Sequence, residues 1–93
     1  MPAAARLNDM SAGHCFFPRG NCQGSPNVFI NGIPVHRVGD SWPIHKCKKK
    51  KHGSVQSQGS ANVFVNGVAI ARIGDSLSCG DVVAQGSPNV FVN

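Results

Sequence analysis

No stretch of this sequence approaches the roughly 18 consecutive apolar residues that a membrane-spanning helix requires. The first ten residues, MPAAARLNDM, also lack the long apolar segment behind a basic start that marks a cleaved export signal. We therefore expect a protein that is made in the cytoplasm without a signal peptide. With 93 residues, the chain is too short for a large core or a deep cofactor cleft, so we expect one domain with an additional stabilising element.

Aromatic residues are scarce, and they do not accompany the basic residues. The formal charge of +5 comes largely from Lys46 and the run Lys48 to Lys51. Phe16, Phe17 and Trp42 lie away from that run. Modules that bind single-stranded nucleic acid interleave aromatic and basic side chains, so we interpret the run as a solvated basic loop and expect no nucleic-acid partner.

The four cysteines, at positions 15, 22, 47 and 79, form no Cys-x-x-Cys pair. A disulfide framework would need one of three pairings, but a chain without an export signal needs no disulfide. Reduced cysteines that bind a metal are the alternative. The sequence therefore leaves both uses open at this point.

What the sequence does contain is a threefold internal repeat. Residues 24–40, GSPNVFINGIPVHRVGD, recur as GSANVFVNGVAIARIGD at 59–75 without a gap. A third copy, GSPNVFVN, begins at 86–93, and its second half lies at the other end of the chain, where residues 1–9 align with GIPVHRVGD. We therefore predict one domain, 1–93, made of three related units, the third of which is divided between the two termini.

Each unit has the sequence of a β-hairpin. Val-Phe-Ile or Val-Phe-Val precedes Asn-Gly, which is the strongest short-range hairpin signal because both residues tolerate positive φ. The predicted tips are Asn31-Gly32 and Asn66-Gly67. A third hairpin requires a strand around Val90 to Val92 to pair with one around Ala3 to Arg6. That pairing closes the ring and removes a free strand edge, whereas the alternative is an open stack of hairpins.

The three connections between the hairpins, 10–23, 41–58 and 76–85, differ in length and sequence although the hairpins hardly vary. We expect these connections to lack a core of their own. Any chemistry of the protein belongs in them, because variable segments on a rigid scaffold are where binding residues concentrate.

Candidate metal ligands occur at matching places in these connections. Each repeat aspartate is followed four or five residues later by a histidine or a cysteine, and threefold symmetry brings the three together. His52, at the far end of the longest connection, is the remaining candidate for the fourth ligand of a tetrahedral zinc ion. The predicted Zn²⁺ ligands are His14, His45, His52 and Cys79. Four protein ligands leave no position for water, so this site would be structural and would hold one zinc ion per chain.

Cys47 competes with Cys79 for the thiolate position. It lies two residues after His45, and its spacing from His52 is Cys-x4-His. The choice between the two cysteines stays open at the level of sequence.

Other polar residues receive structural interpretations. His36 stands at the hairpin position that Ala5 and Ala71 hold in the other units, so we interpret it as a sheet-face residue and exclude it as a ligand. The repeat aspartates follow Arg-x-Gly or Arg-x-Asn at the end of a strand, which suits turn capping and an Arg–Asp pair better than acid catalysis. We predict no catalytic residue and no enzymatic activity.

The same segments carry a family resemblance. The opening Pro2-Ala3-Ala4-Ala5-Arg6 is similar to a Pro-Ala-Ala-Arg motif with one additional alanine, and 33–37 and 69–72 are similar to later copies of it. The GSPNVFxNG and RxGD segments and Cys79-Gly80-Asp81 extend the likeness over essentially the whole chain. The chain thus resembles the PAAR proteins, which cap the trimeric spikes of type VI secretion systems and contractile phage tails.

This resemblance implies a mainly β fold, a small cone of three pseudo-threefold-related hairpins whose vertex is held by zinc through three histidines and one cysteine. The broad base would add to a trimeric β-helical spike, either the valine-glycine-repeat G protein of a type VI system or a phage central spike. The implied function is a tip that caps and sharpens a membrane-piercing spike and touches the target membrane transiently. An adaptor that recruits an effector protein to the spike is the alternative.

The resemblance also carries expectations about location. A protein of this kind is secreted with the injection apparatus or forms part of the virion tail. Family members with fused toxins have extensions before or after the domain, so we expect a tip without a fused toxin.

Overall fold

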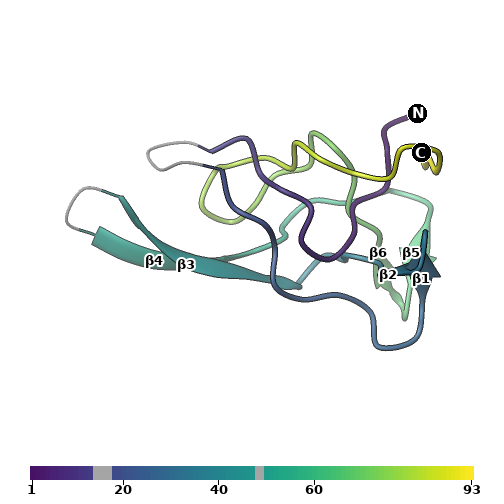
Figure 1. The fold of residues 1–93 in the computed structure, drawn as a ribbon, viewed down its shortest axis with the longest axis horizontal. Helices are drawn as coiled ribbons and strands as arrows, with labels where there is room; N and C mark the ends of the chain where they lie inside the picture. Colours follow the sequence, from purple (N-terminus) through teal and green to yellow (C-terminus); the bar gives the residue numbers. More distant parts are fainter. Residues whose placement is uncertain (14–17, 48–49) are drawn as a thin grey trace.

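The structure, a computed structural model, describes residues 1–13, 18–47 and 50–93, and for 45–47 and 50–52 it describes the backbone alone (Figure 1). Within these residues the fold is mainly β, without a helix that could cross a membrane. Antiparallel pairing joins β1 with β2, β3 with β4, and β5 with β6. The strands are β1 (Phe29–Ile30), β2 (Ile33–Pro34), β3 (Ser41–Cys47), β4 (Lys50–Val55), β5 (Phe64–Val65) and β6 (Val68–Ala69).

The two short hairpins turn where the Asn-Gly pairs predict. Asn31 and Gly32 have φ of 55° and 75°, and Asn66 and Gly67 have φ of 54° and 79°. Two consecutive residues with positive φ define the type I′ turn, whose twist matches the twist of the paired strands. Both predicted hairpin tips are confirmed.

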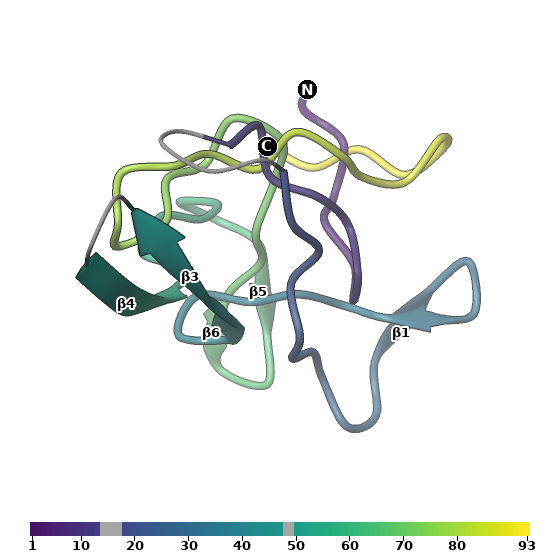
Figure 2. The ribbon, with the colours of Figure 1, turned by 60° about the vertical axis from the view of Figure 1, so that its left-hand side comes forward.

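The two ends of the chain pair with each other to give the third hairpin-like element. Ala3 forms an antiparallel bridge with Phe91, and the N–H of Ala4 donates to the Val90 carbonyl at 3.0 Å. In Figures 1 and 2 the N-terminal and C-terminal segments lie close together. The expected pairing of the termini is confirmed, and the open stack of hairpins is excluded.

A closed ring of backbone hydrogen bonds joins the three units around a common axis. The N–H of Ala5 donates to the Ala71 carbonyl at 2.9 Å, that of Ala71 to His36 at 3.0 Å, and that of His36 to Ala5 at 3.1 Å. All three residues are fully buried. The axis therefore has room for few large side chains, and alanine occupies two of its three equivalent positions.

Two apolar clusters follow one another along this axis. We call the end formed by β1, β2, β5, β6 and the paired termini the base, and the opposite end, with the β3–β4 hairpin and segments 10–13 and 76–83, the vertex (Figure 1). The base cluster contains Ala4, Val35, Val65 and Ile70. The vertex cluster contains Ala5, Trp42, Ala71, Leu77 and Val83.

The vertex cluster corrects the expectation that the connections lack a core. Trp42, Leu77 and Val83 all come from connections, and each is at most 4% exposed. They are isolated apolar residues with no repeated spacing, so no periodic pattern in the sequence predicts their burial. Their burial comes from the ring closure, which brings segments distant in sequence to one axis.

The β3–β4 hairpin is a second departure from the expected loops. Its register pairs Ser41 with Val55 and Trp42 with Ser54, with a shift between Trp42 and His45. The segment contains Pro43 and several lysines and shows no regular apolar alternation, which are features that argue against a strand in a sequence. The hairpin extends the molecule along its longest dimension, 37 Å (Figure 1).

Candidate functional site

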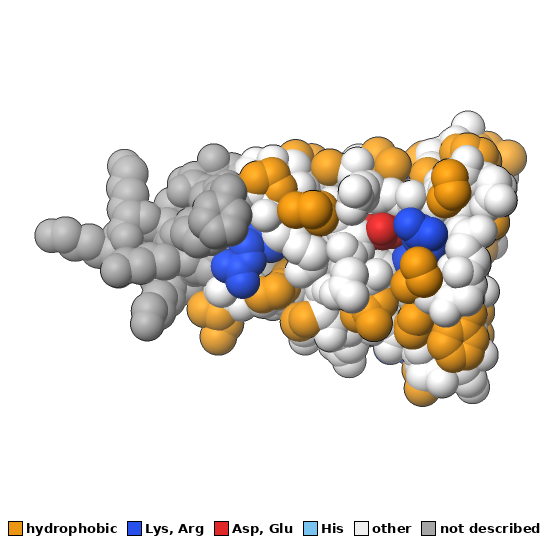
Figure 3. Space-filling model, viewed as in Figure 1, with side chains coloured by type: hydrophobic (Ala, Val, Ile, Leu, Met, Phe, Trp, Pro, Cys, Tyr) orange, Lys and Arg blue, Asp and Glu red, His pale blue; other side chains and the backbone are white. Residues whose placement is uncertain are grey.

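The base presents three exposed phenylalanines at equivalent positions of the three units. Phe29, Phe64 and Phe91 are 54%, 59% and 48% exposed. Figure 3 shows apolar side chains gathered at the broad end of the molecule that these elements form. A large aromatic residue left half in water by all three repeats is informative, because repeated exposure of apolar surface marks an interaction site.

Behind this surface, each repeat arginine binds the aspartate three residues later. In the unit at 24–40, Arg37 Nε and Nη2 donate to the two carboxylate oxygens of Asp40 at 2.9 and 2.8 Å, and the Arg37 backbone N–H donates to Oδ2 at 2.8 Å. The hydrogen bond to Asp40 raises the pKa of Arg37 above its ordinary value, and Asp75 does the same for Arg72. The predicted Arg–Asp pairs are confirmed, and they close the turn at the end of each strand.

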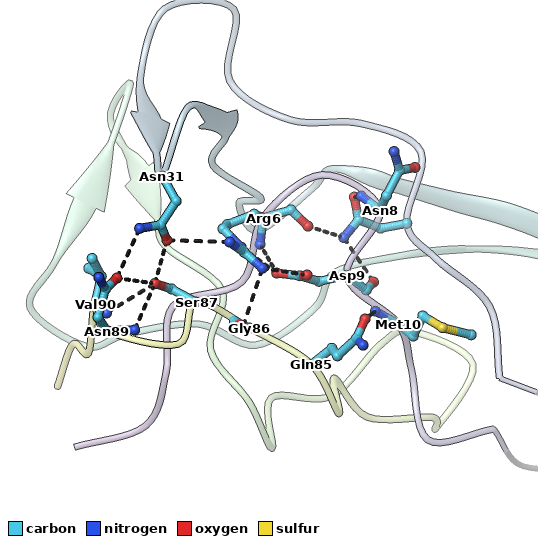
Figure 4. Close-up of polar contacts among 11 residues, drawn as sticks. Arg6, Asn8, Asp9, Met10, Asn31, Gln85, Gly86, Ser87, Asn89 and Val90 are labelled. Atoms are coloured by element: carbon cyan, nitrogen blue, oxygen red, sulfur yellow. Dashed lines mark hydrogen bonds and ion pairs between the residues drawn. The ribbon is translucent and has the colours of Figure 1, made fainter.

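Each hairpin tip is joined by side chains to a neighbouring unit. Asn31 Oδ1 accepts hydrogen bonds from Ser87 Oγ at 2.6 Å and from Arg6 Nη1 at 3.3 Å, and its Nδ2 donates to Asn89 Oδ1 at 2.9 Å (Figure 4). The same set recurs around Asn66. These contacts tie the three units into one rigid base behind the phenylalanines.

At the vertex, the structure places part of the predicted zinc ligand set. His45 and His52 are directly opposite one another in the β3–β4 register. Cys79 is a free, half-buried thiol packed against the vertex cluster. His14 lies outside the described residues. Among the residues that the structure does describe, no group of three candidate ligands is assembled.

The chain segments that lead to these positions are fastened to each other. Gly13, the residue before His14, donates its N–H to Asp81 Oδ2 at 3.2 Å. The N–H of Val55 donates to Ser78 Oγ at 3.1 Å, and the N–H of Ser78 donates back to the Val55 carbonyl at 2.8 Å. The connections from all three units therefore converge beside Cys79.

The competing thiol, Cys47, lies at the end of β3, where its backbone is paired with Lys50. Cys22 is a free, exposed thiol whose Sγ donates a weak hydrogen bond to the Ser41 carbonyl at 3.4 Å. Cys15 lies outside the described residues.

His36 is a core residue and not a sheet-face residue as expected. It is fully buried on the axis, and its Nδ1 lies 2.8 Å from the Gln23 carbonyl oxygen. Burial lowers the pKa of His36 below 6.5, although the hydrogen bond to Gln23 and the charge of Asp40 oppose this effect.

The sequence did not single out two features of the site. The repeated phenylalanine of the Val-Phe-Ile and Val-Phe-Val segments is typical of a strand residue. Only its recurrence in all three units could have indicated that it lies on the surface. Asp81 is buried, at 6% exposed, and bridges two connections at the vertex. The signal for it was its place two residues after a candidate ligand.

Comparison with known families gives one match. A family model described as the PAAR motif matches residues 22–85. No curated protein matches the chain. The matched range includes the two complete repeat units, the β3–β4 hairpin and Cys79.

Proposed function

Because this chain belongs to the PAAR-motif family, we propose that it caps and sharpens a trimeric β-helical, membrane-piercing spike. The family consists of structural spike-tip proteins of type VI secretion systems and contractile phage tails. The observation that carries the proposal is the ring of Phe29, Phe64 and Phe91 at the base.

The symmetry of that ring suits a trimeric partner. A trimer presents each of its end residues three times about its axis, and this single chain presents one phenylalanine from each of three units. Each ring keeps about half of its surface in water, so its complete burial contributes about 1 kcal/mol or more. The rigid base behind the ring lowers the ordering cost of docking.

Substitution of the ring tests this docking. The variant Phe29→Ser/Phe64→Ser/Phe91→Ser is expected to bind the trimeric spike protein of the same genome about a hundredfold more weakly, as measured by titration calorimetry. Ile44→Ser is the matched control, because Ile44 is 67% exposed but lies on the β3–β4 hairpin, away from the base. Unchanged binding by the triple variant, with circular dichroism like that of the parent, would refute the proposal.

We further propose that the vertex holds one structural zinc ion through His14, His45, His52 and Cys79. PAAR-motif proteins bind metal. Two observations support the site: Cys79 is a half-buried, free thiol, and the backbones of His45 and His52 are paired across the β3–β4 hairpin. When bound, zinc would supply a cross-link among three connections.

The chain prepares this cross-link with its own hydrogen bonds. Asp81 holds Gly13 beside the Cys79 turn, and Ser78 holds Val55 of β4 beside the same turn. Groups of this kind orient ligands and raise metal affinity. A vertex fixed in this way resists splaying when the spike passes through an envelope.

Metal content with mutation tests the ligand set. Purified protein is expected to contain about one zinc ion per chain. Cys79→Ser should lose the metal, and the matched variant Cys47→Ser should retain it. Parent protein without metal would refute the site, and the reverse pattern of the two variants would assign the thiolate to Cys47.

The effector-adaptor role keeps one observation in its favour. Ile44 and Val55, 67% and 40% exposed on the β3–β4 hairpin, form apolar surface that docking of the base leaves free. Ile44→Ser should weaken retention of an effector encoded beside this chain while preserving spike binding. Retention equal to that of the parent would remove this role.

A further inference from the structure

One of the three equivalent axial positions differs from the other two. Ala5 and Ala71 are fully buried, and His36, which completes their ring of backbone hydrogen bonds, is equally buried. A titratable ring therefore stands on the axis where the other units have a methyl group. Neither spike docking nor zinc binding uses it.

The hydrogen bonds of the His36 ring fix its neutral tautomer. Nδ1 lies 2.8 Å from the carbonyl oxygen of Gln23, and a carbonyl only accepts, so Nδ1 carries the hydrogen. Nε2 then has a lone pair, and it has no hydrogen-bond partner in the part of the chain that the structure describes. A buried nitrogen without a partner is uncommon in proteins.

The ring also connects the two cores. His36 follows Val35 of the base cluster and meets Trp42 of the vertex cluster edge to face, with ring centroids 5.3 Å apart and planes at 85°. Trp42 is the second residue of β3, and its Nε1 donates to Gln56 Oε1 at 3.2 Å. Gln56 is fully buried, and its Nε2 donates hydrogen bonds to the carbonyls of Gln58 and Ser76.

We propose that His36 is an acid-sensitive joint: protonation of Nε2 uncouples Trp42 and the vertex core from the base. A proton on Nε2 places a full charge on the axis, against the indole. The Gln56 side chain favours the protonated ring, but its Oε1 already accepts the Trp42 hydrogen bond, so an N–H added at Nε2 would share that acceptor with the indole. A shared acceptor weakens the bond to Trp42, and the charge itself stays buried, so the contact on which the vertex core rests loosens.

The charged neighbours of His36 do not relieve this burial. Asp40 favours the protonated ring and Arg37 disfavours it, and these two side chains are paired with each other. The other described residues named around the ring, Ala5, Ala71, Gln23, Trp42 and Gln56, carry no titratable group. On the neighbouring units the nearest charges are again paired, Arg6 with Asp9 and Arg72 with Asp75.

The direction of the pH effect follows from burial. The folded chain holds His36 with a pKa below 6.5, so the unfolded chain binds the extra proton first as pH falls. The stability that depends on a neutral His36 is therefore fully present well above pH 6.5 and declines as the pH falls through 6.5, until His36 is protonated in the folded state as well.

Trp42 offers a direct readout because it is the sole tryptophan of the chain. A protonated imidazole in contact with an indole quenches its emission, whereas the neutral ring quenches far less. Emission of the folded parent protein should fall in a single step below pH 6.5. In the matched variant His36→Gln, which keeps a donor for the Gln23 carbonyl and retains the other three histidines, the step should be absent.

Hydrogen exchange tests the uncoupling itself. In acid, the amides of Gln56 and Leu77 at the vertex should lose protection in the parent, while those of Val35 and Ile70 at the base keep it; His36→Gln should show no such difference. A Trp42 emission step that persists in His36→Gln, or equal loss of protection at both ends of the parent, would overturn the proposal. Neither readout requires zinc or a spike, so both are independent of the proposed function.

Discussion

The base and the vertex of this molecule are specified in different ways. At the base, every important contact occurs in more than one unit: the Arg–Asp pair, the type I′ turn, and the asparagine that reaches a serine of the neighbouring unit. At the vertex, contacts such as Trp42 with Gln56 and Gly13 with Asp81 occur once. Repetition therefore produces a symmetric surface at the base, and unique residues produce an asymmetric vertex.

The two regions also differ in what holds them. The base is closed by backbone ladders and by side chains that bind their neighbours, so it needs no additional ligand. The vertex rests on a small apolar cluster and a few hydrogen bonds between connections. A metal cross-link is most valuable where the covalent and apolar restraints are few.

Removal of the proposed zinc ion is the strongest test of this difference. With free zinc at 1,000 times its dissociation constant, binding contributes about 4 kcal/mol of stability, and we expect a chelator to remove that amount from the vertex alone. Hydrogen exchange should show lost protection at Ser78 and Leu77 and retained protection at Ala4 and Val35. Equal loss at both ends would show that the base depends on the metal too.

A glycine that lies between units should reveal how tightly the base is packed. A Cβ at Gly59 would lie 2.8 Å from the Ile70 carbonyl oxygen and 2.8 Å from Val38 Cγ2, closer than packed atoms approach. Gly59→Ala should lower the free energy of unfolding by about 3 kcal/mol in denaturant titrations. Gly53→Ala is the vertex counterpart: its nearest contact would be Ile44 Cγ1 at 3.7 Å, so stability should hardly change. Similar losses in both variants would contradict the contrast.

Two buried aspartates, one in each region, allow a matched comparison of polar contacts. Asp75 accepts three hydrogen bonds from Arg72, so Asp75→Asn should cost about 2 kcal/mol of global stability. Asp81 accepts the Val82 N–H at Oδ1 and the Gly13 N–H at Oδ2, and the amide of asparagine keeps only one of these two acceptors. Asp81→Asn should therefore cost about 1 kcal/mol, less than Asp75→Asn, and bind zinc about tenfold more weakly. Denaturant midpoints and zinc competition titrations distinguish the two variants.

The same contrast explains which parts of the structure the sequence could predict. Turns at Asn31 and Asn66 and the Arg–Asp pairs depend on residues within a few positions of each other, so local chemistry identifies them. The pairing of Ala3 with Phe91 spans the whole chain, yet it followed from the repeat, because two complete units show what the divided one must form.

The structure of the vertex could not be predicted in this way, because residues at equivalent positions of its three connections are chemically unlike. Asn21, Gln56 and Val83 each donate an N–H to the carbonyl of a repeat aspartate and are each buried, although they share no side-chain chemistry. The threefold backbone continues into the connections while the sequence repeat stops. The β3–β4 hairpin and the vertex cluster were missed for that reason, and the ligand set, which rests on offsets from the aspartates, stays a prediction.

Substitutions at the hairpin tips are expected to have the smallest effect on stability. They distinguish the contribution of the turn conformation from that of the asparagine side chain. Asn66 has φ of 54°, which alanine adopts at a cost of about 1 kcal/mol and glycine adopts freely. Asn66→Ala and Asn66→Gly both remove the hydrogen bonds to Ser25, Arg37 and Asn27. Thermal unfolding should therefore place Asn66→Ala below Asn66→Gly by about that amount. If the two variants unfold together, the side-chain contacts, and not the turn, are what the repeated asparagine supplies to the base.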